Sequence, residues 1–266
     1  PWLTPQDPYD LATVRLTDVN RPPLWQADAP PPDTGRPAPV PLFLLGADGQ
    51  GRDIFSAVIY GLRVSLLVGL GGTLLAGVAG VVLGLIAGWW RGWIEAAIMR
   101  LADIQLAFPS ILIALFLMAV WGQGVGKIVV AVAIAHWVIY ARVVRGTLLA
   151  EREKDYIAAI RALGAGTPRI LLRHLLPNLM TPVLVISAVE FASVVMLEAT
   201  LSFLGLGVPI TRPSLGMLIH IGYTEGSFSN AWWVWLFPGL MLVALVLPLN
   251  WLADTLREMR QRTGER

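Results

Sequence analysis

A run of 27 consecutive residues without a charged side chain, residues 64–90, constrains this chain more than any other feature. An α-helix rises about 1.5 Å per residue, so about 20 apolar residues cross a hydrocarbon core about 30 Å thick. Four further apolar stretches follow, at residues 102–121, 128–144, 179–203 and 231–253. The sequence therefore predicts an all-α polytopic membrane protein with five transmembrane helices.

The composition agrees with a bilayer as the solvent. Of all residues, 56% are hydrophobic and 14% are charged, whereas about 25% of a soluble globular chain is charged. A net charge of +2 spread over an apolar chain makes no basic stripe, which excludes nucleic acid as an expected partner. Because the chain has no cysteine, it has no disulfide, no thiol nucleophile and no cysteine metal site.

Three glycines in the first span, Gly80, Gly84 and Gly88, follow one another at four-residue intervals and so share one helical face. Small residues at this spacing let two helix backbones approach closely in lipid. We expect this face to pack tightly on a neighbouring helix. The alternative is that glycine is merely tolerated in a membrane helix.

Carboxylates interrupt two of the spans. Glu190 and Glu198 lie in the fourth span, where each costs about 3 kcal/mol if Glu is treated like Asp, and Asp103 lies in the second. Such groups must face protein, water or the headgroup region. One hypothesis is that the three residues line a translocation path. The alternative is a structural hydrogen bond to a neighbouring helix.

Lys and Arg are distributed unevenly over the short connections, which predicts the orientation of the spans. Residues 91–101, 142–178 and 254–266 contain 13 basic residues, whereas the loops 122–127 and 204–230 contain only two. The first three segments are therefore expected in the cytoplasm, where basic residues accumulate. The two basic-poor loops are expected on the opposite side.

This orientation gives an expected domain organisation. It comprises an extracytoplasmic Pro-rich segment (1–63), a transmembrane domain (64–253) with a cytoplasmic hairpin (150–178) and an outer loop (204–230), and a cytoplasmic tail (254–266). Proline runs such as residues 30–32, with few apolar periodicities, are typical of a polar, extended segment. An outside start requires an earlier membrane crossing or a cleaved signal, so we expect a segment before Pro1.

Tryptophans gather near the expected ends of two spans. Trp232, Trp233 and Trp235 stand at the outer end of the last span, and Trp89, Trp90 and Trp93 at the inner end of the first. Because tryptophan is enriched at both membrane interfaces, these residues are predicted to be interfacial anchors.

The cytoplasmic connection at residues 150–178 is predicted to form two short helices. In the first helix, acidic residues such as Asp155 favour the first turn, and Gly164 suits the left-handed position that ends a helix. Its expected apolar face consists of Tyr156, Ile157, Ile160 and Leu163.

For the second helix, Thr167 is the predicted cap and Pro168 its first residue. Ile170, Leu171 and Leu175 are expected on its buried face. A hairpin too small to be its own domain is suited to docking on a partner protein and to carrying force. The alternative is an ordinary structured loop packed on the membrane surface.

The same stretch resembles the EAA loop of ABC importer permeases, whose pattern ends G-x9-I-x-L-P. Gly164 is followed after nine residues by His174, then by Leu176 and Pro177 after one further residue. The segments 161–166 (RALGAG) and 173–178 (RHLLPN) are similar to R-A-L-G-A-S and R-H-I-L-P-N, which are typical of the dipeptide, oligopeptide and nickel branch.

Other blocks of the chain resemble the same branch in order. They are residues 45–53 (LGADGQGRD), 60–66 (YGLRVSL), 198–207 (EATLSFLGLG), 213–216 (PSLG) and 250–258 (NWLADTLRE). Departures also occur: Ala158 stands where the general pattern has Glu, and Ile160 replaces its second Ala. Ala47, Leu215 and Ala253 replace Thr, Trp and Gly. None of these changes removes the expected helical hairpin.

The resemblance implies a type I ABC importer permease in the bacterial inner membrane. It implies a heterodimer with a second permease, two ATPase subunits that bind ATP and Mg, and an extracytoplasmic substrate-binding protein. The chain itself is then a non-catalytic subunit without a cofactor. The residues that the resemblance assigns to ATPase coupling are Asp155, Tyr156, Ala158, Ala159, Arg161, Ala162, Leu163, Gly164, Arg173, His174, Leu176 and Pro177. The family also usually has a membrane helix before residues 5–10.

Signatures of catalysis are not found in the sequence. Residues 122–128 (GQGVGKI) lack the first Gly and the Ser or Thr of a phosphate loop. His136, His174 and His220 lie apart in the sequence, which predicts no metal site. His136 is expected to be a satisfied intramembrane polar group, and His174 to make a hydrogen bond at a helix end.

Two other functions remain open at this point. An ion-coupled carrier would show inverted repeats and broken helices with coupling charges. An intramembrane hydrolase would need a paired nucleophile and base. The cargo also stays open, since peptides, nickel complexes and glutathione-like or opine-like solutes all fit the resemblance.

Overall fold

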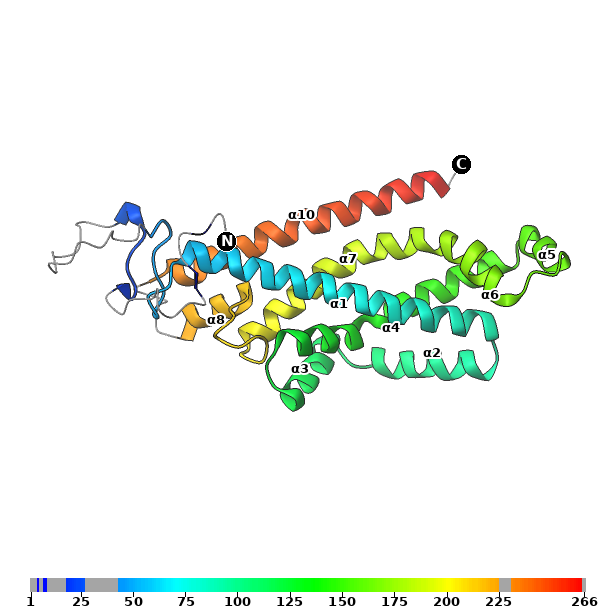
Figure 1. The fold of residues 1–266 in the computed structure, drawn as a ribbon, viewed down its shortest axis with the longest axis horizontal. Helices are drawn as coiled ribbons and strands as arrows, with labels where there is room; N and C mark the ends of the chain where they lie inside the picture. Colours follow the sequence, from blue (N-terminus) through cyan, green and yellow to red (C-terminus); the bar gives the residue numbers. More distant parts are fainter. Residues whose placement is uncertain (1–3, 5–6, 9–17, 27–42, 225–230, 265–266) are drawn as a thin grey trace. The chain divides into compact units, whose positions relative to one another are not determined.

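The computed structural model describes residues 4, 7–8, 18–26, 43–224 and 231–264, and the regular elements within these ranges are helices (Figure 1). The elements are η2 (Leu24–Gln26), α1 (Ile54–Trp90), α2 (Trp93–Leu106), α3 (Ser110–Trp121), α4 (Val125–Arg152), α5 (Asp155–Ala162), α6 (Thr167–Arg169), the π-helical segment η3 (Ile170–Leu175), α7 (Leu176–Phe203), α8 (Leu215–Thr224) and α10 (Trp233–Gly264). The proline runs at residues 30–32 and 37–39 lie outside the described ranges.

Four segments of the described chain are helical, long and apolar enough to cross a membrane. They are Ile54–Trp90, Val125–Arg152, Thr167–Phe203 and Trp233–Thr255. A fifth span results if the bent pair α2 and α3 is counted as one. The all-helical polytopic fold expected from the apolar runs is therefore confirmed.

The first helix begins earlier than the sequence suggested. Residues 54–63 were expected in an extended segment, but α1 begins at Ile54. Asp53 provides the start, because its Oδ2 accepts hydrogen bonds from the Ser56 backbone N at 2.8 Å and from Ser56 Oγ at 2.6 Å. A carboxylate in this position satisfies amide donors that have no partner within the helix. Burial raises the pKa of the Asp53 carboxyl group.

The second expected span is not one straight helix. The α2 and α3 helices meet at an angle of 88°, and Pro109 stands between them with φ −55° and ψ 132°. Proline has no amide hydrogen, and its ring disfavours the helical conformation of the residue before it. Pro109 therefore stands at the break between two helices, which corrects the expectation of one continuous helix over residues 102–121.

Two further helices differ from the expected boundaries. The second helix of the hairpin is not separate, since α6, η3 and α7 form one continuous helical stretch, Thr167–Phe203. The predicted tail at residues 254–266 continues α10, which ends at Gly264. The apolar runs did not predict these two extensions, because residues 167–178 and 254–264 contain charged and polar side chains.

The chain divides into two compact units, each with its own core. One comprises residues 1–67, 123–125 and 198–246, and the other residues 68–122, 126–197 and 247–266. In the first unit, Ile54 and Ala57 of α1 pack with Leu215 and Leu218 of α8 and with Trp233 of α10. Leu45, in the turn before α1, packs against this core.

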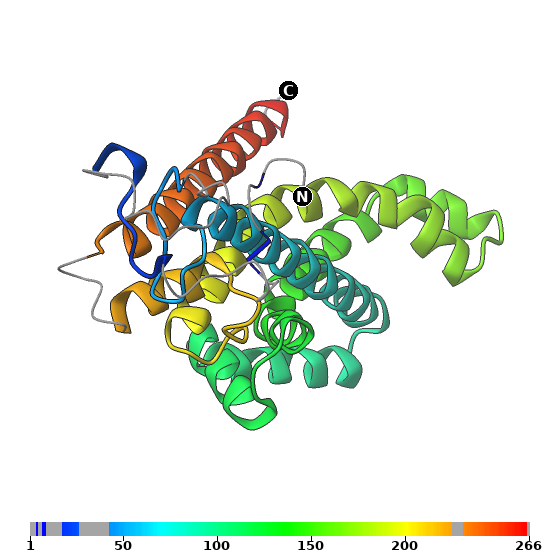
Figure 2. The ribbon, with the colours of Figure 1, turned by 60° about the vertical axis from the view of Figure 1, so that its left-hand side comes forward.

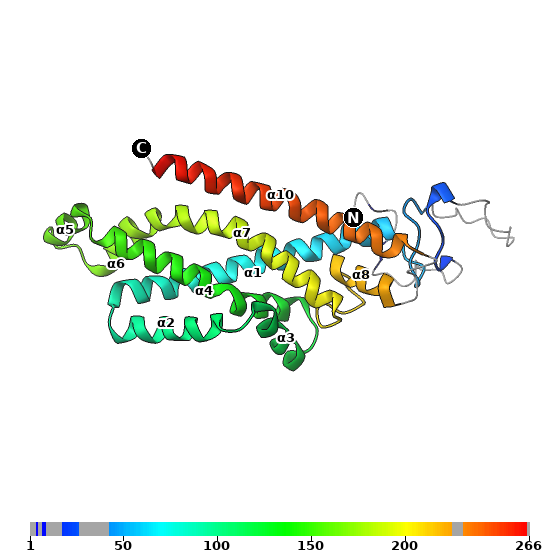
Figure 3. The same cartoon turned by 180° about the vertical axis from the view of Figure 1, so that it is seen from behind.

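The core of the second unit joins α4 and α7 to the second half of α1 and to the hairpin. Figure 3 shows α4 beside α7 over much of their length. The buried members of this core are Ala76, Ala133, Tyr140, Val144, Leu148, Ile157, Ile170, Leu171, Leu175, Leu179 and Val183. The hairpin is therefore packed on the membrane helices rather than attached by a loose loop.

Candidate functional site

The hairpin that carries the EAA-like pattern projects from the ends of α4 and α7 (Figure 2). Its first helix, α5, ends where predicted: Gly164 has φ +81°, and its amide donates to the Arg161 carbonyl oxygen at 2.9 Å. A Cβ at Gly164 would meet no atom within 4 Å, so the backbone conformation, not space, favours glycine here. The turn points the chain back toward the membrane helices.

The start of the second helix differs by one residue from the prediction. Gly166, not Thr167, is the residue before the first helical turn, and the structure shows no side-chain hydrogen bond that caps it. Pro168 lies in the first turn, as expected. A proline there already lacks the amide that would need a partner, so the helix begins without a polar cap.

The apolar side of the hairpin faces the core of its unit. Ile157, Ile170 and Leu175 are almost fully buried, and Leu171 is 8% exposed. Leu163 was expected on this side but is 87% exposed, because it follows the last residue of α5, where the chain begins its turn. The buried side is thus made by Ile157 and three side chains of η3, and Tyr156 and Ile160, which were also expected on it, pack half-buried against this core.

The outer side of α5 and its turn is exposed and mostly small. The exposed residues of the EAA-like pattern are Asp155, Ala158, Ala159, Arg161, Ala162, Leu163, Gly164, Arg173 and Pro177, while Tyr156, His174 and Leu176 are half-buried. Alanine and glycine at the surface give a face into which another protein's side chains can fit. Among the described residues the His174 ring makes no hydrogen bond, so the predicted helix-end bond is absent.

Polar contacts hold α5 on its neighbours. Tyr156 donates its hydroxyl to Glu151 Oε2 at 3.0 Å and accepts from Asn178 Nδ2 at 3.2 Å. Burial raises the pKa of Tyr156, and the hydrogen bond to the Glu151 carboxylate acts in the same direction. Lys154 pairs with the other Glu151 oxygen at 2.6 Å, and this hydrogen bond raises the pKa of Lys154. These contacts join α5 to the ends of α4 and α7.

The carboxylates in α7 both have partners within the chain. Glu190 Oε2 lies 2.6 Å from His136 Nδ1 of α4, and both side chains are buried. Glu198 is fully buried and accepts hydrogen bonds from Ser65 Oγ at 2.8 Å and Ser202 Oγ at 2.7 Å. The structural alternative, a hydrogen bond to a neighbouring helix, describes both contacts. His136 is accordingly a partnered intramembrane group.

Asp103 differs from these two glutamates. Its carboxylate pairs with Arg142 of α4, and the two side chains are 55% and 48% exposed. The three carboxylates are therefore not brought together: Asp103 and Glu190 have different partners on α4, and Glu198 pairs with serines. Within the described ranges, no cluster of three or more His, Cys, Asp or Glu residues could hold a metal ion.

The three glycines of α1 lie directly against α4. A Cβ on Gly84 would lie 2.7 Å from the Ala141 carbonyl oxygen and 2.8 Å from Val144 Cβ. On Gly88 it would lie 2.7 Å from Leu148 Cδ2, and on Gly80 it would overlap the Trp137 carbonyl oxygen. Both helices therefore approach as closely as glycine permits.

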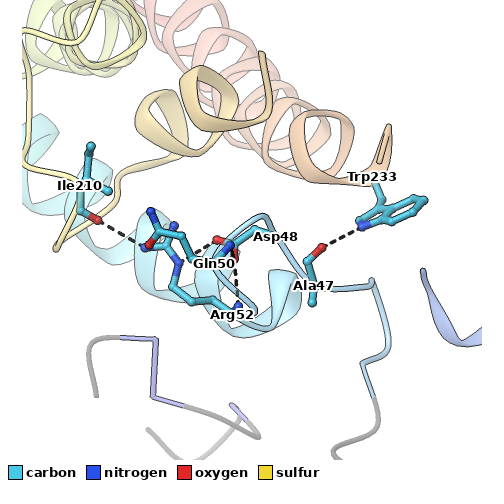
Figure 4. Close-up of polar contacts among 6 residues, drawn as sticks. All are labelled: Ala47, Asp48, Gln50, Arg52, Ile210 and Trp233. Carbon is cyan, nitrogen blue, oxygen red and sulfur yellow. Dashed lines mark hydrogen bonds and ion pairs between the residues drawn. The ribbon is translucent and has the colours of Figure 1, made fainter. Parts of the chain in front are cut away.

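A second motif, residues 45–53, forms a buried turn before α1 (Figure 4). Asp48 Oδ1 accepts the amides of Gln50 and Arg52, each at 2.9 Å, and Asp48 Oδ2 lies 2.7 Å from Arg52 Nε. Arg52 also donates to the Ile210 carbonyl oxygen at 3.3 Å. Asp48 and Arg52 are 0% and 2% exposed, so the motif is an internal structure.

The predicted interfacial role of Trp233 is wrong. Its side chain is buried, and its Nε1 donates to the carbonyl oxygen of Ala47 at 3.0 Å (Figure 4). Gly46, with φ +87°, leaves room for the ring, since a Cβ there would lie 2.6 Å from Trp233 Nε1. The sequence pattern of clustered tryptophans could not distinguish this contact from a membrane anchor.

Comparison with known proteins identifies the family. A family model described as "binding-protein-dependent transport system inner membrane component" matches residues 80–261, which include the hairpin. The chain belongs to this family. The match covers more than half of the chain and most of the expected transmembrane domain.

Curated relatives extend the match to nearly the whole permease. It is 37% identical over 258 residues to the di/tripeptide transport system permease protein DppC of Pseudomonas aeruginosa, which covers 97% of this chain and 80% of the relative. It is 38% identical over 216 residues to a peptide transport system permease protein of Brucella suis biovar 1, covering 81% and 72% of the two chains.

Solved structures show the same fold. A chain of the MetNI methionine ABC transporter in an inward-facing conformation superposes with a TM-score of 0.61 at 18% identity, covering 76% of the permease and 95% of that chain. A chain of an amino acid ABC transporter gives a TM-score of 0.58 at 15% identity, covering 77% and 94%. Together with the family match, these findings make the chain a permease subunit of an ABC importer.

Proposed function

We propose that this permease forms, together with a second permease, the translocation path for peptides, and that the outer face of its hairpin receives an ATPase subunit. The names of the relatives from Pseudomonas and Brucella support peptides as the cargo class. The observation that carries the coupling role is the two-sided hairpin. Its inner side is buried in the core of the membrane helices, and its outer side is exposed.

The mechanism follows from this attachment. A force applied to α5 reaches the membrane helices, because Ile157 lies in the core shared by α1, α4 and α7. In the proposed cycle, ATP binding closes the ATPase subunits and moves the hairpin, which shifts the permease between outward-facing and inward-facing states. The nucleotide thus shifts the equilibrium between the outward-facing and inward-facing states, because the ATPase subunits bind it with different affinity in the two states.

The proposal assigns no chemical step to this chain. ATP and Mg would be bound by the two ATPase subunits, and an extracytoplasmic binding protein would deliver the cargo. The expected location is the bacterial inner membrane. The family description supports partners of this kind, since it names a binding-protein-dependent transport system of the inner membrane.

Among the carboxylates, Asp103 is the best supported candidate for the translocation path. Its pair with Arg142 is exposed on membrane helices, and charged side chains there face water or another protein rather than lipid. Glu190 and Glu198 are buried with partners, which favours a role in holding α4 and α1 against α7. We therefore assign these two to helix packing.

A cross-linking experiment tests the coupling role. The chain has no cysteine, so Ala159→Cys introduces a single thiol on the outer face of α5. In the assembled complex, with one cysteine placed on the ATPase surface, we expect a cross-link whose yield changes with nucleotide. Ala96→Cys, an exposed alanine of α2, is the matched control. Absence of contact at Ala159 in every nucleotide state would contradict the assignment.

Transport assays distinguish the proposal from the ion-coupled carrier. The complete complex in liposomes, with its binding protein, is expected to take up dialanine only when ATP is supplied. Uptake by the purified permease alone, unchanged by removal of ATP, would support the carrier instead.

A further inference from the structure

Two arginine side chains lie over the ring of Trp89, the second-last residue of α1. Arg152 Cζ lies 5.6 Å from the centre of the Trp89 ring, and Arg161 Cζ lies 5.0 Å from it. A cation within about 6 Å of a tryptophan ring centre is attracted by the negative face of the ring. Trp89 also packs against the apolar core that contains Leu148 and Ile157.

The first of these cations, Arg152, is fixed by several contacts. It is the last residue of α4, and its Nη1 donates to the carbonyl oxygens of Gly88 at 3.0 Å and Trp89 at 3.2 Å. These carbonyls belong to the last turn of α1, where they have no helical partner and carry the negative end of the helix dipole. Arg152 therefore joins the end of α4 to the end of α1.

The second cation, Arg161, belongs to α5 itself. Within the described part of the chain it makes no ion pair, and its contact is with the Trp89 ring. Tyr156, on the same helix, is held by Glu151 of α4 and Asn178 of α7. The ring contact thus adds α1 to the two helices that already hold α5.

We propose that Trp89 is a positioning residue for coupling: its ring holds Arg161, and with it α5, on the end of α1. The inference rests on the proposed coupling role of the hairpin. A displacement of α5 would then move α1, α4 and α7 together, because each of these helices makes its own contact with α5. The contact is a cation–ring contact for α1 and a hydrogen bond for α4 and α7. Without the Trp89 contact, α5 is held on α1 only by the apolar core around Ile157, so less of its displacement reaches α1.

Hydrogen exchange of the α5 amides tests the contact itself, independently of cargo. The measurement uses the assembled complex in nanodiscs without nucleotide. For Trp89→Leu we expect exchange of the α5 amides to become about two- to fivefold faster, as expected for loss of one exposed cation–ring contact. Trp89→Phe keeps an aromatic face and should restore most of the protection. Trp90→Leu, at the adjacent and 52% exposed tryptophan, is the matched control.

The number of dialanine molecules taken up per ATP hydrolysed tests the positioning role. We expect this number to fall about threefold or more for Trp89→Leu, to recover for Trp89→Phe and to stay unchanged for Trp90→Leu. Arg161→Ala should lower it similarly, and the double variant Trp89→Leu/Arg161→Ala should be no worse than either single change.

Two results would overturn the inference. One is equal exchange of the α5 amides in Trp89→Leu and Trp90→Leu. The other is faster exchange in Trp89→Leu with unchanged uptake per ATP. Failure of the unmodified complex to transport dialanine would instead count against the peptide cargo, while the exchange measurement would still decide whether the ring holds α5.

Discussion

The hairpin at residues 150–178 and the turn at residues 45–53 both match family patterns, yet the structure uses them in opposite ways. In the turn, Asp48 and Arg52 are buried and bind each other. In the hairpin, the side chains of small residues such as Ala158 and Ala159 are exposed. A pattern match alone therefore does not separate residues that build the fold from residues that meet a partner; their burial does.

Of the substitutions proposed here, one in the turn at residues 45–53 should lower the free energy of unfolding most. Arg52→Ala leaves the Asp48 carboxylate buried without its cation, which we expect to cost about 3–5 kcal/mol in the free energy of unfolding. Denaturant unfolding of the purified permease in detergent measures this loss. The double variant Asp48→Ala/Arg52→Ala should be less destabilised than Arg52→Ala alone. In the hairpin, Lys154→Ala removes an ion pair whose lysine is 55% exposed, and this should cost much less than the loss of Arg52. Equal losses at the two sites would contradict the comparison.

The packing of α1 on α4 gives the next largest effect. Gly84→Ala places a Cβ against the Ala141 carbonyl oxygen and Val144, so the helices must separate, at a cost of about 1–3 kcal/mol. Gly146→Ala, in α4 with no atom within 4 Å of the added Cβ, is the control and should be neutral or slightly stabilising. Thermal unfolding midpoints of the two variants check this, and a stable Gly84→Ala variant would contradict the close approach.

A smaller effect is expected within the hairpin. Gly164→Ala forces an L-residue to adopt φ +81°, which costs about 1 kcal/mol locally and should loosen the end of α5. Gly166 has φ −69°, so Gly166→Ala should be tolerated. Hydrogen exchange of residues 155–165 distinguishes the two variants. Equal protection in both would mean that the left-handed turn is not needed to end α5.

The sequence predicted those parts of the fold that depend on local patterns. Long apolar runs located the spans, and Gly164 located the end of α5. Pro109 was visible inside the second span, but the 88° bend that it allows depends on how α2 packs, with Gln105 donating to the Ile134 carbonyl oxygen of α4. Local patterns therefore predict where a helix is interrupted but not how far the chain turns there.

Contacts between distant residues could not be predicted in the same way. The cost of a buried charge showed that Glu190 needs a partner, but not that His136, 54 residues away, provides it. Trp233 and Leu163 were misassigned for a related reason. Whether an apolar side chain faces lipid, core or water depends on which segment packs against it, and here Ala47 covers Trp233 while nothing covers Leu163. Burial of the turn and exposure of the hairpin are features of this kind.

The central claim is that the exposed face of α5 receives an ATPase subunit, and one substitution tests it most directly. Ala159→Trp fills this face without touching the core, so the unfolding of the purified permease should remain within about 0.5 kcal/mol of the unmodified chain. Binding of the ATPase subunits, measured as their dissociation constant from the permease complex in nanodiscs, should weaken at least about tenfold, while Ala96→Trp on α2 leaves it unchanged. An unchanged dissociation constant for Ala159→Trp would contradict the account.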